Sequence, residues 1–114
     1  MLKESEFVSI RVGVPIGHAE IIRKALGDVG AGVQGKYTHC SGTYRVEGRF
    51  TPITGAHPAI GEIGKPEVVE EVAIETICHK DILERVIDAV QIVHPYEEPP
   101  IDIFPRYEVD KKDA

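Results

Sequence analysis

The sequence lacks tryptophan and contains one methionine and two cysteines among its 114 residues. Two thiols are too few for a scaffold held by several disulfides, so the core must come from aliphatic side chains. No uncharged apolar run reaches the roughly 18 residues that a membrane-spanning helix needs. Residues 1–6 include two acids and no apolar stretch, which argues against a secretory signal. We expect a cytoplasmic protein with reduced thiols and no membrane partner.

Positive charge is also scarce, with 13 Lys and Arg against 19 Asp and Glu. The deficit lies in the second part of the chain: residues 1–50 carry seven basic and five acidic side chains, whereas residues 51–114 carry six and fourteen. Binding to nucleic acid requires a basic face that displaces counterions. The composition therefore argues against a nucleic-acid partner, and acidic loops suit cations better.

The chain has the length and composition of one folded domain. Hydrophobic residues make up 42% and charged residues 28% of the sequence, which is ordinary for a globular protein. We expect a single domain spanning residues 1–114, with a core of about 7–107 and a charged tail, 108–114, that frays. A compact domain of this length has a radius of gyration of roughly 13 Å.

The apolar periodicity changes several times along the chain. A period of two predicts strands over 8–14, 36–50 and 67–79, and a period of 3.6 predicts helices over about 18–29 and from an Asp81 N-cap to Val93. Residues 51–66 show no period, and 99–105 reads as a short edge strand bounded by prolines. This βαββαβ order predicts an α+β, ferredoxin-like sandwich, with four antiparallel strands and both helices on one face. Pairing Phe50 with Glu67 sets the register of the central hairpin.

This topology gathers polar side chains at one pole of the sheet. The set is His18, His57, His94, Tyr96, Glu97 and Glu98. His57, His94, Glu97 and Glu98 are candidate ligands for a divalent transition metal. A structural interpretation competes with this one: prolines hold residues 94–100 extended, His94 closes the helix, and Tyr96 packs its ring on the end of the sheet. The adjacent acids Glu70 and Glu71 are expected to be solvated.

A second candidate cluster is predicted at the opposite pole, where His39 and Cys40 approach Cys78 and His79. Two imidazoles and two thiolates suit zinc or copper. However, neighbouring residues of a strand face opposite sides, so one site would recruit one residue from each strand. The alternative is a pair of half-buried cysteines beside exposed histidines, and a disulfide between them is left open.

The glycine-rich stretch 55–64 lacks both GxGxxG and the Walker lysine, so a nucleotide site there has little support. A rigid contact between subunits is its alternative role.

Several motifs together resemble the insert domain of the NIF-three-like (YqfO-type) family, which is similar to the CutA and PII folds. These motifs are Gly35-Lys36-Tyr37-Thr38-His39-Cys40-Ser41, Gly48-Arg49-Phe50-Thr51-Pro52, Gly55-Ala56-His57-Pro58, Ile60-Gly61 and His94-Pro95-Tyr96-Glu97-Glu98-Pro99. The resemblance runs from about Val8 to Ile103. It implies a ferredoxin-like fold and assembly into trimers. It also implies a ligand site near Gly55, His57, Gly61 and Tyr96.

Full-length members of that family carry a dinuclear metal site on a separate core, whose His-His-Pro segment this sequence does not contain. Hydrolase activity is therefore not carried across. We expect a non-catalytic binding or regulatory protein that forms a homotrimer and binds a metal ion or small molecule near the subunit boundaries. The alternatives are a metal-dependent hydrolase with Glu97 or Glu98 as base, and a module that docks onto a larger enzyme.

Overall fold

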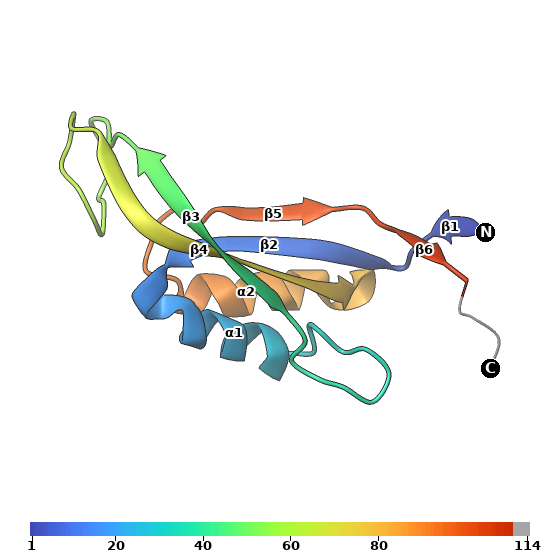
Figure 1. Ribbon diagram of the computed structural model, residues 1–114. Coiled ribbons are helices and arrows are strands. Elements are labelled where there is room, and N and C mark those ends of the chain that lie inside the picture. Colours follow the sequence, from blue (N-terminus) through green and yellow to red (C-terminus); the bar gives the residue numbers. More distant parts are fainter. Residues whose placement is uncertain (111–114) are drawn as a thin grey trace.

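A computed structural model describes residues 1–110 of the chain, with the elements arranged as in Figure 1. Four strands form the main sheet: β2 (Phe7–Pro15), β3 (Gly42–Phe50), β4 (Glu67–His79) and β5 (Ile101–Phe104). The helices are α1 (Ala19–Asp28) and α2 (Leu83–Val93), each preceded by a 3-10 turn, Ile16–His18 or Lys80–Ile82. Two short strands, β1 (Leu2–Glu4) and β6 (Tyr107–Val109), pair with each other. The predicted α+β, ferredoxin-like class is confirmed.

All strand pairs in the main sheet are antiparallel, in the order β3-β4-β2-β5. Phe50 lies opposite Glu67, so the register predicted for the central hairpin is confirmed. β5 occupies an edge, as its flanking prolines indicate. Both helices cover one face of the sheet and leave the other face open (Figure 1).

The core lies between that covered face and the helices. Alternate residues of β2 and β4 point toward the helices, where Ile22 of α1 and Val86 of α2 meet them with no exposed surface. The strand residues in this layer include Val8, Ile10, Val12, Val14, Val72, Ile74 and Cys78. Burying each Val or Ile side chain of this layer contributes about 1.5–3 kcal/mol of transfer free energy.

Three local expectations are corrected. Residues 36–41 form a loop before β3 rather than strand, because Gly32 and Gly35 adopt positive φ and turn the chain. Asp81 does not cap α2: it lies within the 3-10 turn, where its backbone N–H donates to Nδ1 of His79. The expectation of a frayed tail is wrong for residues 108 and 109, which belong to β6, and its residues 111–114 lie outside the described part of the chain.

The molecule is elongated, with principal extents of 57 × 26 × 23 Å and a radius of gyration of 16.1 Å. The value exceeds the roughly 13 Å of a compact chain of this length. The β3–β4 hairpin extends beyond the rest of the sheet at one pole, and the β1–β6 ribbon extends at the other (Figure 1).

Candidate functional site

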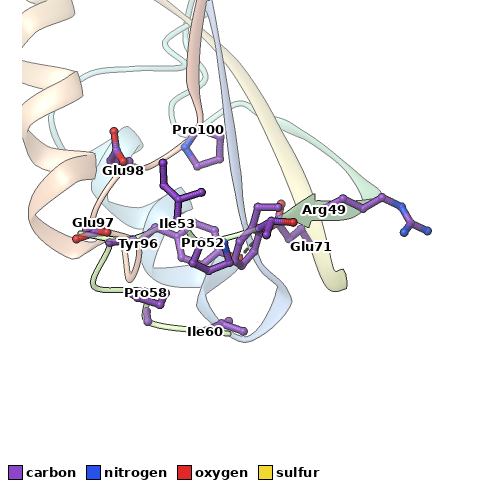
Figure 2. A pocket seen from close by; sticks show the side chains of 15 residues that line it. Arg49, Pro52, Ile53, Pro58, Ile60, Glu71, Tyr96, Glu97, Glu98 and Pro100 are labelled. Atoms are coloured by element: carbon purple, nitrogen blue, oxygen red, sulfur yellow. Dashed lines mark hydrogen bonds between the residues drawn. The ribbon is translucent and has the colours of Figure 1, made fainter. Parts of the chain in front are cut away.

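A pocket of about 400 Å³ lies at the pole of the β3–β4 hairpin (Figure 2). Three parts of the chain line it: the end of β3 with residues 51–60, one residue of β4, and residues 96–100 that lead into β5. The walls are largely apolar and include Phe50, Pro52, Ile53, Pro58, Ile60 and Pro100. The polar side chains are Glu71, Tyr96, Glu97, Glu98, Thr51 and Arg49.

Glu71 is the carboxylate at the base of this pocket. It belongs to β4 and is only 6% exposed, which corrects the expectation of a solvated acid. The Tyr96 hydroxyl donates to Oε2 of Glu71 at 2.6 Å. Burial and this carboxylate raise the pKa of Tyr96 well above its ordinary value, so the phenol keeps its proton.

Gly48 makes room for this carboxylate. A Cβ at Gly48 would stand 2.5 Å from the carboxyl carbon of Glu71 and 2.6 and 2.7 Å from its oxygens. Real Cβ atoms do not approach other atoms so closely, so any side chain at position 48 would displace the Glu71 carboxylate. Sequence reasoning assigned neither residue to the site. The one local signal was a glycine inside an otherwise well-patterned strand, which often marks a close approach.

His94 has a structural role at the same pole. Its ring is 8% exposed, Nε2 donates to the carbonyl of Gly13 at 2.7 Å, and Nδ1 accepts from the backbone N–H of Tyr96 at 3.1 Å. Desolvation lowers the pKa of His94, although the Gly13 carbonyl and the Glu71 charge act in the opposite direction. Both ring nitrogens therefore bond within the protein, and His94 is the C-cap of α2, the helix-closing position that the structural interpretation gave it.

Glu97 joins two of the segments that close the pocket. Its Oε1 accepts a hydrogen bond from the backbone N–H of His57 at 2.9 Å. Of the four predicted ligand-binding residues, Tyr96 lines the pocket. Gly55, His57 and Gly61 lie in the segment between β3 and β4, residues 51–66, but do not line the pocket. Gly55 and Gly61 have φ angles of 100° and 96°, which glycine adopts without strain, and so they allow the backbone of residues 51–66 to turn.

The predicted pole is thus assembled, but its side chains do not converge as a metal site. Within residues 1–110 no group of three or more His, Cys, Asp or Glu is placed to hold a metal ion. Glu97 is tied to the His57 backbone, and both nitrogens of His94 bond to the protein.

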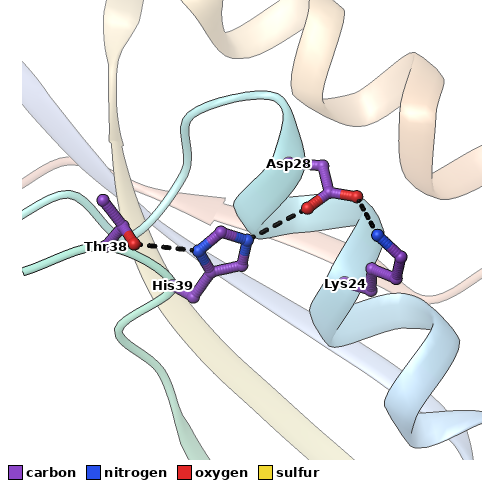
Figure 3. A network of polar contacts seen from close by, with 4 residues as sticks. All are labelled: Lys24, Asp28, Thr38 and His39. Carbon is purple, nitrogen blue, oxygen red and sulfur yellow. Dashed lines mark hydrogen bonds and ion pairs between the residues drawn. The ribbon is translucent and has the colours of Figure 1, made fainter.

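The second predicted cluster, at the opposite pole, does not form. His39 has a φ of 57° and lies in the loop before β3, with its ring against Gly27 of α1. Its Nε2 lies 3.0 Å from Asp28 Oδ1, and its Nδ1 lies 3.0 Å from the Thr38 hydroxyl (Figure 3). The expected approach of His39 to Cys78 and His79 across paired strands is wrong because β3 begins only at residue 42.

The remaining members of that cluster are engaged elsewhere. Cys78 is buried opposite Val8, and burial raises the pKa of its thiol. The ring of His79 packs edge-on against Phe7, with centroids 5.2 Å apart. Cys40 is half-buried, and its carbonyl accepts from the Thr76 hydroxyl at 2.6 Å. Both cysteines are free thiols.

No helix within residues 1–110 is long and apolar enough to cross a membrane.

The sheet order and paired helices define the class of this protein as a ferredoxin-like α+β domain. The periplasmic divalent cation tolerance protein CutA of Archaeoglobus fulgidus has the same fold, with a TM-score of 0.63 and 23% identity over 88% of this chain and 83% of that one. PII of Arabidopsis thaliana bound to citrate superposes with a TM-score of 0.59 and 18% identity, covering 90% and 76% of the two chains. At these identities the likeness shows the fold alone.

Higher identity connects the chain to a more specific group. A Bacillus cereus protein related to NIF3 matches with a TM-score of 0.77 and 42% identity, covering 93% of this chain and 26% of that one. The GTP cyclohydrolase 1 type 2 homolog of Bacillus subtilis is 45% identical over 84% of this chain and 26% of its own length. No family model matches the sequence. This chain is therefore a homologue of NIF3-related proteins, over about a quarter of their length, and the resemblance drawn from its motifs is confirmed.

Proposed function

We propose that this protein is a non-catalytic binding or regulatory module that holds a small molecule in the pocket beneath residues 51–60. The observation that carries the proposal is the construction of that pocket. Segments distant in sequence are fixed around it by the Tyr96–Glu71 and Glu97–His57 hydrogen bonds. Its volume of about 400 Å³ lies within the range of small-molecule sites, which are mostly apolar with a few fixed polar groups.

The proposal includes assembly into a homotrimer in the cytoplasm. The resemblance implies trimers, and the open face of the sheet offers a surface for them. Tyr44 and Phe104 on this face are 45% and 47% exposed, and the buried Nε of Arg11 has no hydrogen-bond partner within residues 1–110. The edge strands β3 and β5 provide further routes to pairing between subunits. Two free thiols support a reducing compartment.

A pocket-filling variant tests the proposed site. Ala59 lines the pocket, so Ala59→Trp should fill it, whereas Thr54→Trp adds the same side chain to the same segment outside the lining. A library of neutral, cationic and anionic small molecules is screened by ligand-detected NMR, and native mass spectrometry records the assembly of each sample. We expect trimers for all three proteins, with binding lost only in Ala59→Trp. Equal binding by both tryptophan variants would refute the pocket assignment, and a monomer would refute the assembly.

A further inference from the structure

The charge of the pocket lining is unbalanced toward the acidic side. Three carboxylates, Glu71, Glu97 and Glu98, line the pocket that residues 1–110 form, and Arg49 is its only basic residue. Arg49 forms an ion pair with Glu47, and Figure 2 shows its guanidinium pointing away from the other lining side chains. The cation that would balance these carboxylates is therefore not supplied by the lining itself.

Glu71 is the carboxylate for which this imbalance matters most. It is only 6% exposed, and its Oε2 alone is engaged, by the Tyr96 hydroxyl. Among residues 1–110, Oε1 has no hydrogen-bond partner and Glu71 has no ion-pair partner. Oε1 is not among the fully buried atoms that lack a partner, so it stays accessible from the pocket, where an opposite charge within hydrogen-bond reach would replace the hydration that this enclosed carboxylate has lost. The hydrogen bond from Tyr96 satisfies Oε2 of Glu71, and Oε1 remains free to accept a hydrogen bond from a ligand.

The walls indicate what kind of cation fits. Phe50 and Tyr96 meet edge to face with ring centroids 6.0 Å apart, and Pro52, Pro58 and Ile60 add apolar surface. Such walls suit a hydrocarbon body and can attract an ammonium group through the aromatic rings. A phosphate or carboxylate ligand would be repelled by the three acids.

We propose that the pocket selects small organic cations, in which an ammonium group donates to Glu71 Oε1 and a compact hydrocarbon body packs against Phe50 and the prolines. This inference rests on the proposed function and specifies its ligand class. A side chain from a second copy could supply the same cationic chemistry, so the experiment must distinguish that source from a free amine.

The test compares three probes with the same ring: cyclohexylmethylamine, cyclohexylmethanol and cyclohexanecarboxylate. Affinities are measured by NMR titration against the wild type, Glu71→Gln and the control Glu62→Gln. Glu62 is an exposed acid of the neighbouring segment that pairs with Lys65 and does not line the pocket. The substitution Glu71→Gln keeps the shape of the side chain and an oxygen that can accept from Tyr96, so the fold should be retained. A double variant, Glu97→Gln with Glu98→Gln, serves if Glu71→Gln does not fold.

We expect the wild type to bind the amine at least about tenfold more tightly than the alcohol and to bind the carboxylate least. Glu71→Gln should remove this preference, and Glu62→Gln should preserve it. Equal affinity for amine and alcohol would overturn the cation inference while leaving the proposed binding function intact. Absence of binding by every probe, together with no hit in the library screen, would refute both. Amine binding that appears only after the copies dissociate would assign the cation to a second subunit and overturn the proposal.

Discussion

Replacing Gly48 with alanine tests the packing at the base of the pocket. In an ordinary strand position this change stabilises a protein by about 0.5–1 kcal/mol, because glycine loses more backbone entropy on folding. Here the new Cβ would stand 2.5–2.7 Å from the Glu71 carboxylate and force it to move. The move breaks the bond from Tyr96, and a hydrogen bond to a charged group contributes about 1.5–3 kcal/mol. We therefore expect a net loss of about 1–2 kcal/mol.

The assay is urea unfolding of the wild type, Gly48→Ala, Glu71→Ala and the double variant at one protein concentration. Removing the Glu71 carboxylate removes the clash, so Gly48→Ala in the Glu71→Ala background should be neutral or stabilising by about 0.5–1 kcal/mol. The coupling between the two changes should then be about 2 kcal/mol, well above the error of additivity. Additive effects, or a Gly48→Ala protein as stable as the wild type, would refute the reasoning.

Two further predictions concern titratable groups. Because the pKa of His94 is lowered from 6.5, the unfolded chain binds more protons in the window below that value, so stability should be constant above about pH 6.5 and fall as the pH drops through it. Urea midpoints at about pH 7.5 and about pH 5.5 measure this fall, and His94→Gln should largely remove it. Gly27→Ala would place a Cβ 2.0 Å from His39 Cδ2 and expel the ring from Asp28. The hydrogen bonds from Lys24 and then His39 hold the pKa of Asp28 below its ordinary value of 3.8. In Gly27→Ala, and equally in His39→Ala, this pKa should rise part of the way to 3.8. NMR of the side-chain carboxyl measures the pKa, and the absence of a rise would contradict the His39–Asp28 contact.

The elements with strong periodicity were predictable from the sequence. β2, β4 and the two helices follow from apolar spacing, and the hairpin register followed from aligning the ends of two strands across the 51–66 segment. The strands β1 and β6 carry no such pattern, since Leu2, Tyr107 and Val109 are all exposed. Their pairing depends on where the sheet places the two ends of the described chain, which local sequence does not reveal.

The location of the site was predictable from the sequence, but the residues that form it were predictable only in part. Topology alone brought residues 57 and 94–98 to one pole, and Tyr96 was identified as a ligand-binding candidate. Glu71 was missed because adjacent acids of a strand point to opposite faces and are ordinarily solvated. Its burial involves Gly48 across the strand pair and Tyr96, 25 residues away, which local sequence does not reveal. His39 was misplaced because it adopts a positive φ that turns the loop, a conformation that only a few per cent of non-glycine residues adopt and that the strand-like composition of 36–50 does not indicate.

The β1–β6 ribbon determines how the domain would respond to tension on its two ends. Leu2 lies opposite Val109 and Glu4 opposite Tyr107, so the chain enters and leaves side by side at the pole remote from the pocket. A pull on both ends would open these backbone hydrogen bonds one pair at a time, as in unzipping, instead of shearing them together. We therefore expect the ribbon to open first under such a pull, before the load reaches Glu71 at the far end of the sheet.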